Sequence, residues 1–195
     1  MYRRWPATYE APGAGLMAAP QLKGRAMSES LMTLAPMEAA GEVLGQLPRG
    51  VFLTVKHKNR LNTMTIGWGT IGIMWTRPVF VAPVRRSRYT YGLIERSPDF
   101  TVSVPTDDEY RKALTVCGTT SGRDGDKLAN AGLSVRDATE TDTPVLDIPG
   151  IHLECKTLLR APMATELMDP SLMDVYPASD LHTLFYGQIL ACYRV

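Results

Sequence analysis

The stretch NTMTIGWGTIGIMWTRPVFVAPVRRSRYT, residues 62–90, decides the fold that we predict for this chain. It contains β-branched, aromatic and valine-rich runs bounded by Gly, Pro and Ser, a pattern typical of β-strands. It ends in a basic turn, residues 85–90, and a helical segment follows at residues 91–97. A strand, a basic turn and a helix N-terminus together offer what a flat, phosphorylated ligand needs.

Within this stretch GWGTIG, residues 67–72, matches the GxGxxG pattern of dinucleotide-binding folds. In those folds the glycines open a helix whose N-terminus holds a pyrophosphate. Here a β-branched and aromatic run follows, and Pro78 closes it in a way that a helix interior would not accept. We therefore interpret the match as coincidental and reject a Rossmann fold.

The flanking sequence continues the strand pattern. We expect strands at 50–55, 61–66, 78–84, 99–104, 151–161 and 181–195, and helices at 36–47, 91–97, 107–116 and near 128–133. The acidic first turn of the helix at 107–116 suits the helix macrodipole. Alternating strands with few, short helices favour an antiparallel barrel over a parallel sheet. The predicted fold class is therefore mainly β.

Length and charge bound the class of protein. With 195 residues and 21.5 kDa, the chain is long enough for one domain with a single core. Its 21 basic and 20 acidic residues give a net charge of +1, so no general attraction to nucleic acid or to an anionic membrane follows. The sequence contains no run of about eighteen apolar residues, so it predicts no membrane-spanning helix. Any anion site must therefore be local.

The cysteines and histidines argue against a disulfide-stabilised protein and against a metal-binding protein. Cys117, Cys155 and Cys192 are an odd number, far apart, which argues against a disulfide framework and indicates a reducing, cytoplasmic location. The three histidines are equally scattered, so we expect no metal site.

Residues 1–30 differ from the rest of the chain. Pro and Gly punctuate them, and they lack the continuous apolar core of a signal peptide. We interpret them as a flexible N-terminal extension that precedes a domain at residues 36–195. A transit peptide is the less favoured alternative, because no amphipathic pattern is present.

The basic turn is the first candidate site. The hydroxyls of Ser87 and Thr90, the amides of a helix N-terminus and the guanidinium groups of Arg85 and Arg88 are the donors and charges that a phosphate monoester needs. The alternative is a solvated turn in which Ser87 is only the N-cap of the helix.

A second loop, TTSGRDGDK at residues 119–127, repeats this chemistry. Its glycines would let backbone amides approach an anion, and Lys127 would balance the charge. The alternative is an ordinary surface loop with capping residues. By itself the loop does not decide between the two.

The glycines of residues 62–75 would let a planar ring lie close to a strand, because they lack a Cβ. The alternative treats the glycines as strand bends and places the neighbouring apolar residues in the core, namely Met64, Ile66, Ile71 and Ile73. Trp68 and Trp75 are interpreted as packing residues.

His182 stands before a strand near the C-terminus. A lone histidine is usually a hydrogen-bonded structural residue, but one at the edge of a cofactor would donate to a ring carbonyl or contact a reductant. Cys117 is interpreted as a small apolar residue, because the sequence shows no cause for a reactive thiolate.

Five motifs occur in a characteristic order: N-x-M-T-I-G-W-G, W-T-R-P-V, V-R-R-S-R-Y-T, S-G-R-D-G-D-K and H-T-L-F-Y-G-Q-I. Together they resemble the flavin-reductase-like FMN-binding split-barrel family, especially its flavoredoxin-like branch, over residues 45–194. The resemblance implies a six-stranded antiparallel split barrel with short peripheral helices. It also implies a homodimer with one non-covalent FMN near each subunit interface.

The resemblance assigns roles to residues as well. Those expected to contact the isoalloxazine, largely through backbone, are Asn62, Thr63, Met64 and Thr65. Those expected to hold the phosphate and ribityl chain are Arg85, Ser87, Arg88 and Thr90, with Ser121 and Lys127 closing the site. His182 would lie on the flavin or nicotinamide side.

The implied function is an NAD(P)H-dependent flavin oxidoreductase that passes electrons from NADH or NADPH through FMN to free flavin or another small acceptor. The sequence shows no side-chain nucleophile or obligatory general base. Two alternatives stay open. One is a flavoredoxin-like FMN electron carrier that a partner protein reduces, and the other is a flavin-binding domain without a redox role.

Overall fold

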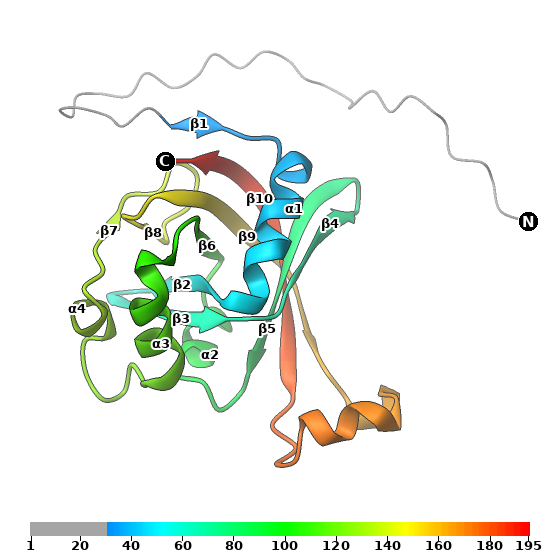
Figure 1. The fold of residues 1–195 in the computed structure, drawn as a ribbon. Coiled ribbons are helices and arrows are strands. Elements are labelled where there is room, and N and C mark those ends of the chain that lie inside the picture. Colours follow the sequence, from blue (N-terminus) through cyan, green and yellow to red (C-terminus); the bar gives the residue numbers. More distant parts are fainter. Residues whose placement is uncertain (1–30) are drawn as a thin grey trace, which may run out of the picture.

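A computed structural model describes residues 31–195, and the extension expected at residues 1–30 lies outside this range. The described chain forms an antiparallel sheet with short helices beside it, which confirms the mainly β class (Figure 1). The strands are β1 Met32–Thr33, β2 Val51–His57, β3 Arg60–Ile66, β4 Thr70–Met74, β5 Arg77–Arg85, β6 Asp99–Pro105, β7 Val135–Arg136, β8 Val145–Leu146, β9 Gly150–Pro162 and β10 His182–Arg194. The helices are α1 Pro36–Gln46, α2 Tyr89–Ile94, α3 Arg111–Thr119 and α4 Lys127–Ala131, and the 3-10 segments are η1 Leu47–Arg49, η2 Asp108–Tyr110, η3 Thr165–Leu167 and η4 Pro170–Val175.

The main sheet has eight strands, in the order β3-β2-β6-β9-β10-β5-β4, with β1 paired to β10. This is two more than the six expected. One addition is the two-residue β1, and the other is the edge strand β4, which contains the end of the GxGxxG string. Because a strand follows these glycines, the rejection of a Rossmann unit is confirmed.

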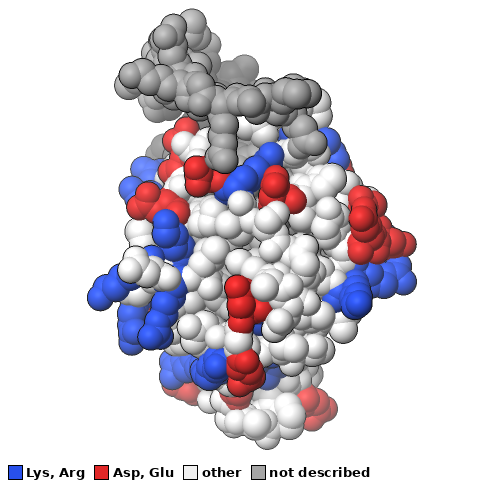
Figure 2. Space-filling model, turned by 90° about the vertical axis from the view of Figure 1, so that its left-hand side faces the viewer, with Lys and Arg blue, Asp and Glu red and all other residues white. Residues whose placement is uncertain are grey.

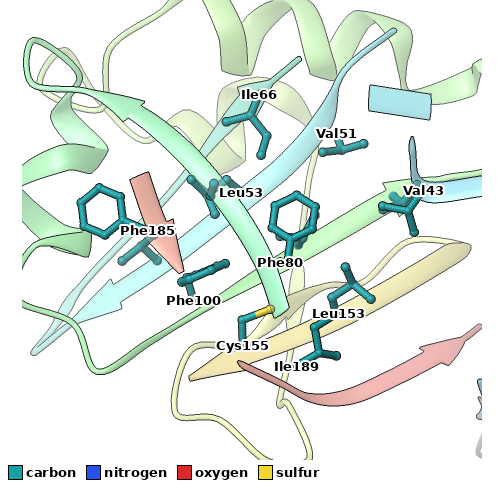
Figure 3. Close-up of a cluster of buried hydrophobic side chains, with 14 of the residues drawn as sticks. Val43, Val51, Leu53, Ile66, Phe80, Phe100, Leu153, Cys155, Phe185 and Ile189 are labelled. Atoms are coloured by element: carbon teal, nitrogen blue, oxygen red, sulfur yellow. The ribbon is translucent and has the colours of Figure 1, made fainter. Parts of the chain in front are cut away.

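The core lies where strands from both halves of the chain face one another. Phe80 of β5, Phe100 of β6 and Phe185 of β10 are fully buried in one cluster, which Val43 of α1 covers (Figure 3). Burying each such ring contributes about 1.5–3 kcal/mol relative to leaving it exposed. Ile73 does not join this core: its side chain is 58% exposed on the edge strand β4.

Two expectations about helix starts are wrong. Ser87 is not the N-cap of α2, because Arg88 holds that position and the Ser87 hydroxyl donates instead to the carboxylate of Asp180. The acidic run before α3 forms the separate segment η2, in which the Asp107 carboxylate accepts from the Glu109 amide at 3.0 Å. In both cases a side chain expected to cap or open a helix has another hydrogen-bond partner. Ser87 binds Asp180, and Asp107 accepts from Glu109 of η2.

Residues 163–181, here called the arm, connect the long strands β9 and β10. They include η3 and η4 and extend away from the body of the molecule, where Figure 1 draws them in orange. The arm returns to the sheet at His182, whose first partner on β5 is Arg85. This end of the sheet positions the candidate site.

Charge on the surface is mixed. The face seen in Figure 2 carries both signs around its edges, and a few acidic side chains also lie near the middle of its otherwise largely uncharged surface. Among residues 31–195, no helix has the length and apolar character needed to cross a membrane.

We predict that Gly187→Ala lowers the free energy of unfolding by about 1–3 kcal/mol, the usual cost of overpacking a core. A Cβ at Gly187, next to a β-bulge of β10, would lie 2.5 Å from Phe100 Cζ and 2.8 Å from Cys155 Cβ. Urea denaturation measures the change. Gly72→Ala on β4 is the control, because a Cβ there meets no atom within 4 Å. Equal losses in the two variants would contradict the packing argument.

Candidate functional site

A cavity of about 220 Å³, here called the ring cavity, lies where the ends of β3 and β5 meet the start of β10. Its lining residues are Met64, Thr65, Ile66, Gly67, Trp68, Pro83, Arg85, Arg88 and His182. Gly67 lets the backbone itself form part of the wall. Of the three glycines expected to face a ring, Gly67 is the one that lines this cavity, whereas a Cβ at Gly69 would meet Phe80.

A second cavity of about 140 Å³, here called the basic cavity, adjoins the first, because Met64 and Arg88 line both. Its other lining residues are Ser87, Tyr89, Thr90, Cys117, Gly118, Thr119, Thr120, Ser121, Arg123 and Lys127. The basic turn, the end of α3 and the loop before α4 therefore meet here. These are the two separate stretches in which sequence alone placed anion-binding chemistry.

Three cations and no carboxylate line the basic cavity. Lys127 is only 7% exposed, and its Nζ donates to the Cys117 carbonyl at 3.0 Å. Burial lowers the pKa of Lys127, and the salt bridges within residues 31–195 involve Arg111 and Arg194 instead. A buried ammonium without a carboxylate is costly, and a bound anion would offset that cost.

Arg123 joins the two loops of the basic cavity. Its Nη1 donates to the Ser87 carbonyl at 3.4 Å, and its guanidinium carbon lies 5.6 Å from the centre of the Tyr89 ring. The loop packs closely at Gly122, where a Cβ would meet Asn62 and lie 2.6 Å from Tyr89 Cδ1. The second loop is thus held against β3 and the basic turn.

Asn62 and Thr63 line neither cavity. The amide of Asn62 donates to Thr90 Oγ1 at 2.7 Å, and the Thr63 hydroxyl lies 3.2 Å from that of Thr54. Both residues are buried, so they contribute to the packing around the site and do not line its cavities. Thr65 lines the ring cavity, and its hydroxyl donates to the Leu114 carbonyl at 2.6 Å, which ties β3 to α3.

Arg85 and Ser87 bind the arm. The Arg85 guanidinium donates to the carbonyls of Asp180 at 3.3 Å and Val175 at 3.2 Å. The Ser87 amide and hydroxyl both donate to the Asp180 carboxylate. Of the two arginines predicted to bind phosphate, Arg88 is therefore the one that lines both cavities, while Arg85 holds the arm against the ring cavity.

His182 closes one side of the ring cavity. It is 8% exposed, its Nδ1 lies 2.8 Å from Tyr176 Oη, and its ring centre lies 5.1 Å from that of Trp68. Burial lowers the pKa of His182 to about 4, and Arg85 contributes in the same direction. The imidazole is therefore neutral at pH 7 and can donate or accept one hydrogen bond.

Sequence reasoning did not identify every residue of the site. Trp68 lines the ring cavity and is 48% exposed, and Trp75 is 51% exposed beside Tyr186, so neither lies in the core, and their expected role as packing residues stays a prediction. Arg123 was not singled out, although it lies in the glycine-containing loop already considered. The available signal was its charge, since Arg123 is a second cation in that loop beside Lys127. Cys117 is buried and its pKa is raised to about 11 by burial, as befits an unreactive thiol.

The antiparallel sheet with short helices has the architecture of FMN-binding split barrels. The chain belongs to the flavin reductase-like domain family, whose model matches residues 44–195. Members of this family bind FMN.

Solved structures support the same fold. An FMN-binding domain of a flavin reductase-like enzyme from Shewanella baltica is 19% identical, with a TM-score of 0.63 over 85% of this chain and 77% of that chain. The flavoredoxin of Desulfovibrio vulgaris is 20% identical, with a TM-score of 0.59 over 91% and 77%. An NADH:FAD oxidoreductase of Streptomyces globisporus, in complex with NAD and FAD fragments, is 19% identical, with a TM-score of 0.58 over 75% of this chain and 74% of that chain.

We predict that acidification destabilises the protein through His182. Its folded pKa of about 4 lies below the ordinary 6.5, so between these values the unfolded chain binds a proton that the folded protein does not. The free energy of unfolding therefore falls as the pH drops through this window. In His182→Gln the fall between pH 7 and 4.5 should be roughly 2 kcal/mol smaller.

Urea denaturation at both pH values measures this difference. His152, whose pKa burial also lowers to about 4, remains in the variant and retains its share of the fall. An equal fall in variant and wild type would contradict the assignment to His182.

Proposed function

We propose that the protein binds FMN without a covalent bond and transfers electrons from NADH or NADPH through it to free flavin or another small acceptor. The observation that carries the proposal is the adjoining pair of cavities, one lined by Gly67, Trp68 and His182 and the other by three cations without a carboxylate. A flat ring that bears a phosphate monoester has matching chemistry at both ends. The related oxidoreductase that binds NAD and FAD fragments supports a nicotinamide as reductant.

The residues present fit FMN. Arg88, Arg123 and Lys127 would balance the phosphate charge, and the hydroxyls of Ser121 and Thr90 lie in the same lining. Met64, Thr65 and Gly67 would support the ring. When bound, FMN would supply the redox chemistry, since it accepts a hydride and passes electrons onward.

The chain itself contributes position and electrostatics. The neutral His182 offers one hydrogen bond at the wall of the ring cavity, and Arg88 carries a positive charge between the two cavities. Donors fixed in place before a reaction need no reorganisation during it. Trp68, half exposed at the same wall, leaves this side within reach of a small electron donor or acceptor.

An electron carrier is the second candidate. Its support is the structural likeness to a flavoredoxin together with the exposed side chain of Trp68 at the ring cavity, which a protein partner would cover. A carrier of this kind would be reduced by a redox protein and would react slowly with a nicotinamide.

The visible absorption spectrum under anaerobic conditions tests the reductase proposal. We expect the FMN-loaded protein to show a flavin band that bleaches within seconds of adding NADH or NADPH, because the ring cavity is open to a small reductant. A band that persists with both nicotinamides but bleaches with a redox protein would select the electron carrier. No band after incubation with FMN would overturn both.

We predict that Arg88→Ala weakens FMN binding by about 1.5–3 kcal/mol, the range for a hydrogen bond to a charged group, which is roughly ten- to hundredfold in affinity. Fluorescence titration measures the change. Arg86→Ala is the matched control, because the neighbouring Arg86 is exposed and lines neither cavity. Riboflavin should bind both the wild type and Arg88→Ala with similar affinity, and an equal loss for riboflavin would argue against a phosphate contact.

We also propose that a second copy of the chain covers the edge strand β4. Ile73, Met74 and Trp75 are 58%, 40% and 51% exposed there, and an apolar sheet edge favours association. Light scattering should give twice the chain mass of 21.5 kDa. Trp75→Glu should shift the protein toward monomer, whereas Leu167→Glu on the arm, where Leu167 is 85% exposed, should not. A monomeric wild type would overturn this proposal.

A further inference from the structure

The arm has one buried side chain, that of Tyr176, and apolar burial alone does not explain why this residue is the buried one. Among residues 163–181, Tyr176 is the buried one, at 5% exposed, whereas Leu167 and Leu172 are 85% and 44% exposed. The arm therefore buries a phenol and leaves Leu167 and Leu172 exposed, the reverse of what apolar burial alone would favour. A specific contact selects the tyrosine.

That contact is with His182. Tyr176 Oη lies 2.8 Å from His182 Nδ1, and the two rings meet edge-on with centres 5.5 Å apart. The Arg85 guanidinium lies 4.9 Å from the centre of the Tyr176 ring. Since Arg85 also donates to the carbonyls of Val175 and Asp180, the arm is held on both sides of the tyrosine.

The direction of the hydrogen bond follows from the acceptors within reach. The phenol has one proton, and near it lie His182 Nδ1 at 2.8 Å and the Met163 sulfur at 3.7 Å. An imidazole nitrogen is the stronger acceptor, because a thioether accepts only weakly. This difference in acceptor strength favours donation from Tyr176 to Nδ1, which would leave the proton of the neutral imidazole on Nε2.

The groups around His182 keep the imidazole neutral. Burial is the largest cause that lowers the pKa of His182. Arg85 and Arg88 lower it further, and Asp180 raises it. The two ring nitrogens point in different directions. With Nδ1 bound to the arm, Nε2 is the nitrogen left for a ligand in the ring cavity that His182 lines.

We propose that Tyr176 is a positioning residue that fixes His182 as the Nε2–H tautomer, so that the imidazole presents a hydrogen-bond donor to a carbonyl oxygen or ring nitrogen of the heterocycle in the ring cavity. The identity of that heterocycle as FMN rests on the proposed function. The contact between Tyr176 and His182 does not. Without the phenol, the imidazole would divide between two tautomers, and only one of them presents this donor.

Nitrogen NMR of histidine-labelled protein without added FMN tests the tautomer directly. We expect His182 of the wild type to carry its proton on Nε2, and Tyr176→Phe, which keeps the ring under Arg85, to populate both tautomers. Tyr91→Phe is the matched control, since the Tyr91 hydroxyl lies near Glu95 and Thr183 and not near His182. A proton on Nδ1 in the wild type would overturn the proposal even if no variant folds. So would an unchanged tautomer in Tyr176→Phe.

FMN titration tests whether the tautomer matters for the ligand. Tyr176→Phe should weaken FMN binding about two- to tenfold, the loss of one ordinary hydrogen bond, and Tyr91→Phe should not. In a His182→Ala background the Tyr176→Phe substitution should have no further effect, because the tyrosine acts through the histidine. Equal losses in both backgrounds would overturn the proposal. If the wild type binds no FMN, the proposed function fails, while the NMR result still decides the role of Tyr176.

Discussion

The antiparallel register that pairs His182 with Arg85 is the constraint on which the site depends. Side chains alternate between the two faces of a strand, so a slip of one residue would turn His182 away from the ring cavity. The same slip would remove Phe185 from the core, where it is fully buried. Core packing and site geometry are therefore fixed together. The small Gly187, at the bulge of β10, lets the strand pass the Phe100 ring in this register.

The second constraint is the charge of the basic cavity. Lys127 is buried beside a carbonyl and not beside a carboxylate, and Arg123 is held by a carbonyl and an aromatic face. These contacts orient the cations without neutralising them, so their charge remains for a ligand. Because the chain as a whole has a net charge of only +1, this attraction is local. An anion bound here would also stabilise the folded state, since the unfolded chain has no such site.

The sequence was sufficient for the fold class, for the main strands and for the two loops that meet in the basic cavity, because these depend on local alternation and turn chemistry. It was insufficient where a distant partner decides the role of a side chain. Ser87 reads locally as a helix cap or a phosphate ligand, yet its hydroxyl binds Asp180, 93 residues away. Asn62 likewise lies behind the site because it pairs with Thr90, 28 residues away. No pattern within one segment contains these pairings.

The two arginines of the basic turn show how such distant partners divide one motif between two roles. Arg85 and Arg88 are alike in chemistry and three positions apart, so sequence alone gave both to the phosphate. The guanidinium of Arg85 is committed to two carbonyls of the arm and to the face of Tyr176. Arg88 lines both cavities and has no part in holding the arm. Arg85 therefore shapes the ring side of the site through the arm and His182, whereas Arg88 is placed to act on a ligand directly.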